Sequence, residues 1–428
     1  MTTLTGFRRK DGTFGVRNEV LVLSTVHCAN AAAQQIAASE QVPCITHEHG
    51  CTEAETIAAR TTLGLARAGQ SPNVFGVLLV SLGCEQIDVQ ALKEQIGAHT
   101  DEVQTLCIQT CGGMPQAVEE GKAIVRRMKQ AAEKQSREPM PTKQLIVGVQ
   151  CGGSDWTTAL AGNAVIGEMT DRIVEMGGSV LMGEVYGFPG SEHIVAEHAV
   201  NRQVGAEIMQ MIRELRADFI EKTGYPIERV NPTPGNKAGG ITTLVEKSMG
   251  NVKKMGSAPI QGVLKVGQRP PHPGLWIVDN RNEGPDSFNI TAFAMASAHA
   301  VVFSSGRGTP VGNVVMPVLK LTGNPERYNL LQSIRLLADV EVSFAEHCVD
   351  GITANKEKID YFLNRSLMNV TALSPLIGYE NAAKVAHYAH ENDLSLRDAA
   401  LALKVCTPEE FDATVVPANM VHPLKKAK

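Results

Sequence analysis

Between residues 18 and 185 the chain alternates short apolar runs with longer amphipathic stretches, and this alternation limits the possible folds more than any other feature. The runs that predict strands are Val20–Thr25, Val74–Leu82, Gln104–Ile108, Leu145–Gln150 and Ser179–Met182. The stretches that predict helices are Ala29–Ala38, Glu53–Ala68, Val89–Gly97, Pro115–Gln135 and Asn163–Met176. Strands that alternate with helices pair in parallel, because each helix crosses over one face of the sheet. We therefore expect an α/β fold with a parallel-sheet catalytic region.

The pattern changes twice further along the chain. His193–Lys222 predicts one long amphipathic helix, and glycine and proline are dense from 231 to 325, which is typical of a loop-rich lobe that carries a site. After Glu326 the strand signals end, and an all-α segment is expected with helices at Tyr328–His347, Lys356–Thr371, Asn381–Asn392 and Leu396–Leu403. These changes predict three domains: an α/β domain over 1–140, a second α/β catalytic domain over 141–325, and a helical segment over 326–428.

Composition excludes several classes of partner. The formal net charge of −5 provides no basic surface for nucleic acid or for an anionic membrane. Apolar stretches fall short of the roughly 18 residues that a membrane helix needs, and the polar start Met1–Phe14 predicts no signal peptide. Nine cysteines, an odd number scattered over 428 residues, favour a reducing compartment over a disulfide framework. A cytoplasmic protein is expected.

Four cysteines sit beside a glycine or a histidine, and three of them close a short apolar run. They are Cys28, Cys51, Cys84 and Cys151. The carboxyl ends of parallel strands meet at one edge of a sheet, where open α/β sheets place their chemistry. Thiols that recur there, with histidine nearby, indicate iron or another transition metal. The alternative is that each cysteine is a small buried hydrophobic residue.

Histidine supplies candidate ligands and bases next to these cysteines. His47 and His49 are two residues apart in an extended segment, so both can face one metal, or one can bind it while the other acts as a base. His27 precedes Cys28 and joins the same pool of ligands. The alternative is that the histidines are partly buried and bonded to backbone carbonyl groups.

Three glycine-rich segments carry candidate substrate-binding residues. Pro234–Gly240 contains Asn236 and Lys237 in a turn that can bind an anion, although it lacks the spacing of a Walker loop. Ser304–Pro310 contains Arg307, whose guanidinium can grip a carboxylate, and Thr309. The third segment, after Cys151, contains Ser154 and Asp155, which could bind an oxygen ligand or could cap the helix that follows. Ordinary turns with solvated Lys237 and Arg307 side chains are the alternative for the first two.

The residues from about 6 to 325 resemble the altronate/D-galactarate dehydratase family, in its large-subunit form. The motifs that carry the resemblance are Gly6-Phe7-Arg8-Arg9-Lys10-Asp11-Gly12, Gly15-Val16-Arg17-Asn18, His47-x-x-Gly50-Cys51, Leu82-Gly83-Cys84-Glu85, Cys151-Gly152-Gly153-Ser154-Asp155, Asn231-Pro232-x-Pro234-Gly235-Asn236-Lys237, Gly267-Gln268-Arg269-Pro270 and Gly306-Arg307-Gly308-Thr309-Pro310. The resemblance implies iron-dependent removal of water from sugar acids; one branch of the family releases sulfite from sulfolactate instead. It also implies a separate small subunit, because the family's amino-terminal substrate-entry domain is missing from this sequence.

The residues from about 326 to 428 are similar to the carboxyl end of class II fumarases. The motifs are Tyr328-Asn329-Leu330-Leu331-Gln332-Ser333-Ile334-Arg335-Leu336-Leu337-Ala338-Asp339, Gly351-Ile352-x-Ala354-Asn355, Ser366-Leu367-Met368-x-Val370-Thr371-Ala372-Leu373, Ile377-Gly378-Tyr379 and Pro417-Ala418-Asn419-Met420-Val421. The fumarase loop Gly-Ser-Ser-x-Met-Pro-x-Lys does not occur, so fumarase chemistry is not expected. Because the matching fumarase helix lies in a bundle that spans subunits, the resemblance implies a homo-oligomer.

These observations lead to a hydro-lyase hypothesis with two rivals. In it, Arg307 and Lys237 bind the carboxylate of a sugar acid, and His47 or His49, or else Lys237, removes the adjacent proton. Iron, as Fe2+ or as an iron–sulfur cluster, is held by ligands drawn from Cys28, Cys51, Cys84 and Cys151 and assists the departing hydroxyl. The rivals are a sulfolactate sulfo-lyase large subunit and a non-catalytic chimera that oligomerises through its fumarase-like helices.

Overall fold

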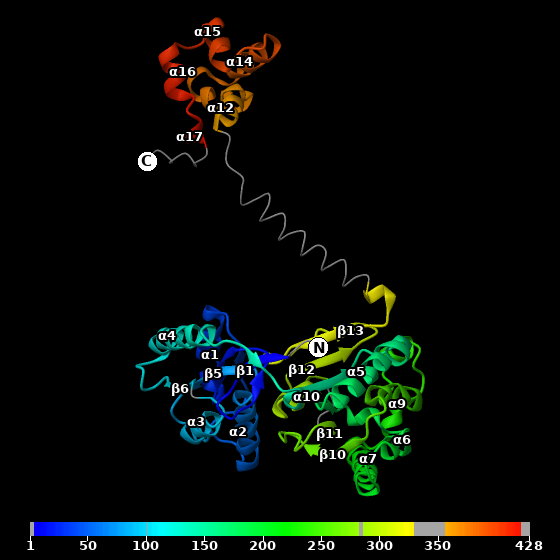
Figure 1. Cartoon of the computed structure of the whole chain (residues 1–428). Coiled ribbons are helices and arrows are strands. Elements are labelled where there is room, and N and C mark those ends of the chain that lie inside the picture. Colours follow the sequence, from blue (N-terminus) through cyan, green and yellow to red (C-terminus); the bar gives the residue numbers. More distant parts are fainter. Residues whose placement is uncertain (1–3, 101, 282–285, 329–355, 421–428) are drawn as a thin grey trace. The chain divides into compact units, whose positions relative to one another are not determined.

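The computed structural model describes residues 4–100, 102–281, 286–328 and 356–420. The chain divides into two compact units, residues 1–332 and 333–428, and each unit is described by itself (Figure 1). The larger unit is built on parallel sheets and the smaller one is helical, so the prediction of an α/β fold with a helical carboxyl-terminal segment is confirmed. The division into three domains stays a prediction.

The first half of the larger unit contains a four-stranded parallel sheet with the order β4-β3-β5-β6. Its strands are β3 (Glu19–Ser24), β4 (Cys44–Ile45), β5 (Val74–Ser81) and β6 (Glu102–Cys107), and its helices are α1 (Asn30–Glu40), α2 (Glu55–Gly69), α3 (Val89–Gly97) and α4 (Met114–Glu133). Side chains alternate between the faces of β3. Val20 and Val22 pack with α1 and α4, whereas Leu21 and Leu23 pack with α2 and α3. Both faces are therefore buried, as a parallel sheet requires.

The second half of this unit contains a six-stranded parallel sheet with the order β10-β11-β9-β8-β12-β13. Its strands are β8 (Ile146–Cys151), β9 (Ser179–Met182), β10 (Ile260–Lys265), β11 (Gly274–Asp279), β12 (Ala300–Ser304) and β13 (Val318–Leu321). The segment from 231 to 325, which was expected to be rich in loops, contributes four of these strands. These strands have only four to six residues each, so loops still make up much of the segment.

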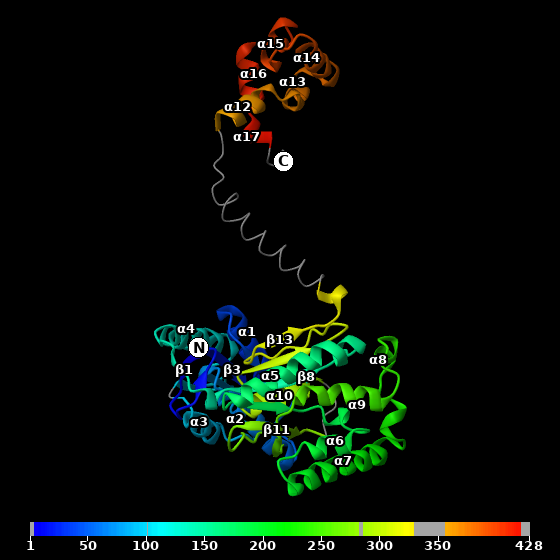
Figure 2. The ribbon, with the colours of Figure 1, turned by 45° about the vertical axis from the view of Figure 1, so that its right-hand side comes forward.

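Helices cover both faces of the six-stranded sheet. They are α5 (Asn163–Glu175), α6 (Glu192–Glu197), α7 (Arg202–Thr223), α8 (Pro234–Ala238), α9 (Leu244–Val252) and α10 (Asp286–Met295). Ile166 of α5 and Ile208 of α7 pack with Met182 of β9, while Phe293 of α10 packs on the other face with Leu181 of the same strand. Helix α7 packs against β10. In Figure 2, α7 runs along the lower edge of the green region.

The prediction of one helix over His193–Lys222 is wrong. The segment forms α6 and α7, and the chain between them pairs with the sheet edge, since Ala199 forms a β-bridge with Ile260. Asn201 then begins α7, because its side chain accepts a hydrogen bond from the amide of Val204. The amphipathic pattern continues on both sides of the short extended segment, so the sequence pattern does not show where α6 ends and α7 begins.

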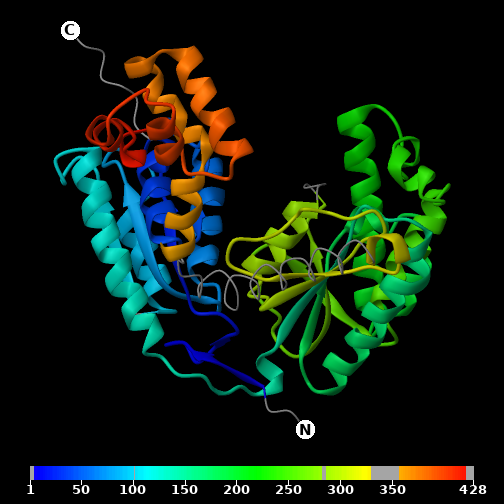
Figure 3. The same cartoon turned by 90° about the horizontal axis from the view of Figure 1, so that it is seen from above.

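Buried polar groups join the two halves of the larger unit, which Figure 3 shows side by side in blue and in green to yellow. The Nδ2 atom of Asn73 donates to the carbonyl of His299 at 2.9 Å, and the His299 ring lies 2.7 Å from the carbonyl of Phe14. A small antiparallel sheet, β2-β1-β7, lies at the start of the unit. Its strands are β1 (Thr5–Arg8), β2 (Phe14–Gly15) and β7 (Glu138–Pro139).

The smaller unit is a helical bundle with its own core. Its elements are α12 (Lys356–Arg365), the 3-10 segment η8 (Leu367–Leu373), α13 (Ser374–Ile377), α14 (Tyr379–Glu391), α15 (Leu396–Ala402), α16 (Pro408–Thr414) and α17 (Pro417–Met420). Leu373, Val385, Leu396 and Phe411 are buried together. Apart from Tyr328, the helix predicted for Tyr328–His347 lies outside the described residues. No described helix of either unit is both long and apolar enough to cross a membrane.

Candidate functional site

Three of the predicted cysteine ligands lie together at the carboxyl edge of the four-stranded sheet. Cys28 follows β3, Cys51 follows β4 and Cys84 follows β5, and all three are exposed. The pKa of the Cys84 thiol is raised by its loss of water contact and then by negative charge at Cys51, Glu85 and Cys28. The influence of Cys51 on this pKa shows that the two thiols are near neighbours. The shared edge therefore brings these thiols within interaction range of one another.

The loop that presents Cys84 is held by one carboxylate. Glu85 accepts hydrogen bonds from the amides of Gly83 and Cys84, at 2.7 and 2.9 Å, and from the hydroxyl of Thr25 at 2.7 Å. Burial alone would raise the pKa of Glu85, but these hydrogen bonds lower it, so the carboxylate stays ionised. Gly83 has a φ of 115°, a backbone conformation that residues other than glycine rarely adopt. The sequence Gly83-Cys84-Glu85 thus fixes the position of the thiol.

The predicted histidine pair lies next to the three thiols. The amide of His27 donates to the carbonyl of His49 at 2.8 Å, which ties the Cys28 turn to the segment before Cys51. The rings of His47 and His49 are 5.7 Å apart, and the amide of His49 donates to Nδ1 of His47 at 3.2 Å. Burial, followed by the charge at His49, lowers the pKa of His47. Its Nε2 atom is buried and has no hydrogen-bond partner within the part of the chain that the structure describes.

Both histidines line a cavity of about 1000 Å³ between α2 and α10. Arg60, Asp279 and Asn280 also line it, and apolar side chains of both helices supply much of the remaining wall. Asp279 ends β11, so the carboxyl edges of both parallel sheets contribute to this cavity. Lys237 and Arg307 are not among the side chains found to line it. The predicted bases, His47 and His49, therefore line this cavity, whereas the predicted carboxylate-binding residues Lys237 and Arg307 do not.

Iron is the metal that the resemblance implies, and the donor atoms at this edge fit it. Cysteine thiolates are ligands that iron and iron–sulfur clusters use, and three exposed thiols lie at this edge. Among the residues that the structure describes, no three His, Cys, Asp or Glu side chains already converge as a metal site. Binding would thus require the thiols to turn toward one another from their exposed positions.

The three glycine-rich segments meet at the carboxyl edge of the six-stranded sheet. The amide of Arg307 donates to the carbonyl of Gly153 at 3.0 Å, and Nδ2 of Asn236 donates to the carbonyl of Ser154 at 2.9 Å. A Cβ atom at Gly235 would overlap the guanidinium of Arg307, so glycine is needed for this approach. Arg307 and Lys237 are exposed, and neither pairs with any acidic side chain of the described residues.

The other predicted substrate-binding residues make contacts inside these loops. Asp155 is buried and its carboxylate accepts hydrogen bonds from Thr157, Thr158 and Asn324, which lower its pKa although burial alone would raise it. Such contacts are those of a residue that fixes a turn. Thr309 accepts a hydrogen bond from the amide of Val311 at 3.2 Å. Their roles toward a substrate stay predictions.

Cys151 has different surroundings from the other three cysteines, and here the expectation of one shared ligand set needs correction. It ends β8, is 4% exposed and lies 3.2 Å from Nζ of Lys254, which is completely buried. Lys254 also pairs with Glu184 at 3.0 Å, and the Cys151 thiol lies 3.4 Å from the same carboxylate. An ammonium group thus stands where a metal bound to this thiol and carboxylate would need to be.

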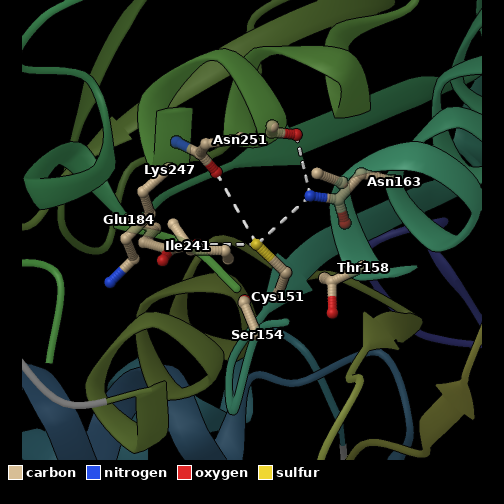
Figure 4. A pocket seen from close by; sticks show the side chains of 10 residues that line it. Cys151, Ser154, Thr158, Asn163, Glu184, Ile241, Lys247 and Asn251 are labelled. Carbon is tan, nitrogen blue, oxygen red and sulfur yellow. Dashed lines mark hydrogen bonds between the residues drawn. The ribbon is translucent and has the colours of Figure 1, made fainter. Parts of the chain in front are cut away.

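A cavity of about 10 Å³ adjoins Cys151 (Figure 4). Nδ2 of Asn163 lies 3.5 Å from the thiol, and Oδ1 of Asn251 lies 3.9 Å from it. Two further carboxylates complete this polar region, Glu184 at the cavity wall and Asp286 over Gly152. Burial, and then the charge of Glu184, raises the pKa of Asp286 to about 6.

The sequence analysis missed Lys254, Glu184, Asp286, Asn163 and Asn251. Glu184 follows the predicted strand Ser179–Met182, so the strand-end argument used for the cysteines could have found it. Lys254 gave no such signal, because it does not follow a predicted strand and a lysine beside another lysine is ordinarily exposed.

Comparisons with known protein families divide the chain in the same order. The family described as "D-galactarate dehydratase/Altronate hydrolase, second domain" matches residues 6–133, and "D-galactarate/Altronate dehydratase, C-terminal" matches residues 142–347. The family "Fumarase C C-terminus" matches residues 370–422.

Individual relatives show the same division. Altronate dehydratase of Bacillus subtilis is 35% identical over 338 residues, which are 76% of this chain and 66% of that protein. The (2R)-sulfolactate sulfo-lyase subunit beta of Chromohalobacter salexigens is 30% identical over 349 residues, 80% of this chain and 86% of that protein. Fumarate hydratase class II of Neisseria meningitidis is 60% identical over 111 residues, 26% of this chain and 22% of that protein. The chain thus spans slightly less than two thirds of the altronate dehydratase.

Proposed function

Because the chain belongs to the D-galactarate/altronate dehydratase family, we propose that it is a hydro-lyase that removes water from an acyclic sugar acid of the altronate or galactarate type. The observation that carries the proposal is the group of three exposed thiols beside His47 and His49, two histidines that line a cavity of about 1000 Å³. A cavity of this volume can hold a six-carbon acid.

Cys28, Cys51 and Cys84 would hold the iron. Iron bound there, as Fe2+ or in a cluster with one open position, supplies a Lewis acid for the hydroxyl that departs. Glu85 keeps the Cys84 loop in place through its bonds to two amides and Thr25. Cys151 is left out of this set, because Lys254 and Glu184 already surround its thiol.

His47 is the proposed base that removes the proton next to the carboxylate. Its lowered pKa keeps the ring neutral at pH 7, and its hydrogen bond from the amide of His49 fixes Nδ1 as the acceptor. The other ring nitrogen, Nε2, then carries a hydrogen, so proton removal by Nε2 requires the opposite tautomer or a turn of the ring. His49, whose Nδ1 contacts Glu53 at 2.8 Å, is the alternative base.

Arg307 and Lys237 are proposed to bind the substrate carboxylate, and Arg60 is the alternative because it lines the cavity. The variants R307Q and R60Q separate the two possibilities. The substitution that removes the carboxylate contact should raise KM for altronate about 10- to 100-fold, since a charged hydrogen bond is worth about 1.5–3 kcal/mol. The other of these two substitutions should leave KM for altronate nearly unchanged.

A direct assay tests the function itself. The full chain, supplied anaerobically with Fe2+, is expected to convert altronate or galactarate to the 2-keto-3-deoxy acid with loss of water. Absence of turnover with every six-carbon aldonate and aldarate tried would contradict the proposal.

Sulfolactate sulfo-lyase activity is the second candidate, because the match covers 86% of the Chromohalobacter subunit. Both reactions begin with removal of the proton next to the carboxylate and differ in the group that leaves. Sulfite release from sulfolactate, without dehydration of sugar acids, would favour this candidate.

The name of that relative also supports a separate small subunit as a partner of this chain. The smaller unit supports a homo-oligomer, since exposed Tyr361, Phe362, Met368 and Tyr379 leave apolar surface on its helices. A chain that ends after residue 328 should then show a lower oligomeric state in light scattering. An unchanged number of chains per particle would remove this role from the smaller unit.

A further inference from the structure

The small cavity beside Cys151 contains hydrogen-bonding groups that no described residue satisfies. Asn163 and Asn251 both line it, and they are 1% and 2% exposed. Nδ2 of Asn163 donates to the carbonyl of Gly250 at 2.8 Å, but its Oδ1 has no partner in the described part of the chain. The Nδ2 atom of Asn251 likewise has none among the described residues. An unsatisfied buried amide costs about 1–3 kcal/mol, so a polar group is needed here.

The backbone around this cavity has two unusual features. Thr158–Gly162 forms a π-helical turn directly before α5, and Thr158 and Ala159 of that turn line the cavity. Glu184, which also lines it, has a φ of 57°. Both features are costly for ordinary residues, and they occur most often at functional sites.

The kind of group that fits follows from charge and size. A cation is excluded because the Lys254 ammonium already lies between the Cys151 thiol and Glu184. An added anion would meet the Glu184 carboxylate at the wall, with Asp286 close behind it. The lining also contains Lys247, whose ammonium already donates to Oδ1 of Asn231 at 2.8 Å. The other polar lining groups are the neutral side chains of Ser154, Thr158, Asn163 and Asn251. A volume of about 10 Å³ holds one water-sized group, which leaves a hydroxyl.

Two asparagines link this cavity to the large one. Asn280 lines the large cavity and donates through Nδ2 to Oδ1 of Asn289. The same oxygen of Asn289 accepts a hydrogen bond at 2.8 Å from the amide of Glu184, which lines the small cavity. These hydrogen-bonded side chains form the wall between the two cavities. On another side the small cavity adjoins a loop proposed to bind the carboxylate, because Ser154 lines it and the carbonyl of Ser154 accepts a hydrogen bond at 2.9 Å from Nδ2 of Asn236, next to Lys237.

We propose that the cavity lined by Cys151, Asn163 and Asn251 binds one hydroxyl group of the sugar acid and so selects polyhydroxy acids. The proposal rests on the proposed dehydration of such acids and adds the residues that recognise the substrate. Lys254 and Glu184 act as positioning residues, because their ion pair holds the thiol side of the cavity.

The test is the steady-state kinetics of N251L with altronate as substrate. The substitution removes the unpaired donor and keeps the branching at Cγ while adding volume that fills the cavity, and Asn251 makes few other bonds. We expect KM to rise about 10- to 100-fold and kcat to change less than about threefold, because one buried hydroxyl loses its partner. N251D, which replaces the donor by an acceptor, should raise KM in the same way and provides a second variant if N251L does not fold.

The matched control is S248A. Ser248 is buried in the same helix, α9, and bonds to the carbonyl of Phe188, but it does not line the cavity. S248A should leave KM for altronate unchanged.

Unchanged KM in folded N251L and N251D, with lower melting temperature or kcat only, would overturn the inference, since the cavity would then hold a structural water. A wild-type chain that dehydrates no sugar acid would overturn the proposed function, and the inference with it.

Discussion

The two parallel sheets of the larger unit present cysteines at their carboxyl edges, in opposite surroundings. At the four-stranded sheet, Cys28, Cys51 and Cys84 are exposed and interact with one another. At the six-stranded sheet, Cys151 is buried and lies against a lysine and a glutamate of the same unit. Among the described residues, no lysine or arginine is hydrogen-bonded to the thiols of the first edge, whereas Lys254 lies 3.2 Å from the thiol of the second.

The difference teaches that a strand followed by a cysteine predicts the position of a thiol but not its chemistry. The chemistry depends on residues that are distant in the sequence, since Lys254 is 103 residues from Cys151. We call the edge with the exposed Cys28, Cys51 and Cys84 the open edge, and the edge with the buried Cys151 the closed edge. On the proposals above, the open edge binds iron and the closed edge binds a substrate hydroxyl.

H47Q should abolish most of the activity if the open edge carries the chemistry. Loss of a general base lowers kcat by about 10²- to 10⁴-fold, and glutamine retains hydrogen-bonding groups but cannot take up the proton. Dehydration of altronate by the iron-supplied chain measures the effect. H272Q, which changes an exposed histidine in a loop, should retain wild-type kcat. Near-normal activity of H47Q would assign the base to another residue.

K254M should destabilise the larger unit without affecting iron. The substitution leaves Glu184 buried without its partner, and such a loss costs about 3–5 kcal/mol. Chemical denaturation followed by fluorescence of the larger unit measures the change. The neighbouring Lys253 is exposed, so K253M should change the free energy of unfolding by less than about 0.5 kcal/mol. Equal effects of the two variants would contradict the buried pair.

D286N should remove a pH dependence that the closed edge imposes. In the folded chain the pKa of Asp286 is about 6, above its ordinary value of 3.8, so the folded state keeps this proton longer than the unfolded state does. The contribution of Asp286 to the free energy of unfolding is therefore at its maximum below pH 3.8 and is lost as the pH rises through about 6. D286N should be more stable than wild type by up to about 3 kcal/mol at pH 7.5 and equally stable near pH 3.5. A constant difference at every pH would contradict this account.

Much of the fold could be predicted because it depends on local patterns. The range Val89–Gly97 was predicted with its observed bounds, and β3 and β5 were each predicted to within one residue, since their apolar runs are buried on both faces. The strands β1, β2, β4 and β7 were missed because they are two to four residues long, which is too short for a pattern to develop. The strands β10, β11 and β13 were not predicted either, because they lie in the segment that is dense in glycine and proline and was expected to be rich in loops.

The candidate site was predictable only in part. The meeting of Cys28, Cys51 and Cys84 follows from parallel strands, whose carboxyl ends share one edge. The burial of Lys254 and the backbone conformation of Glu184 depend on tertiary packing between α9, β8 and β9, and no local pattern reports it. Local sequence did indicate the environment of Asp155. Its hydrogen bonds to Thr157 and Asn324 are those of a residue that fixes a turn, in line with the alternative that it caps the following helix.

Iron content per chain tests the central contrast most directly, measured after anaerobic supply of Fe2+ and removal of loosely bound metal. Wild type and C151S should retain the same amount of iron, whereas C84S, and equally C28S or C51S, should lose most of it. Loss of iron from C151S, or full retention by C84S, would contradict the assignment of the metal to the open edge.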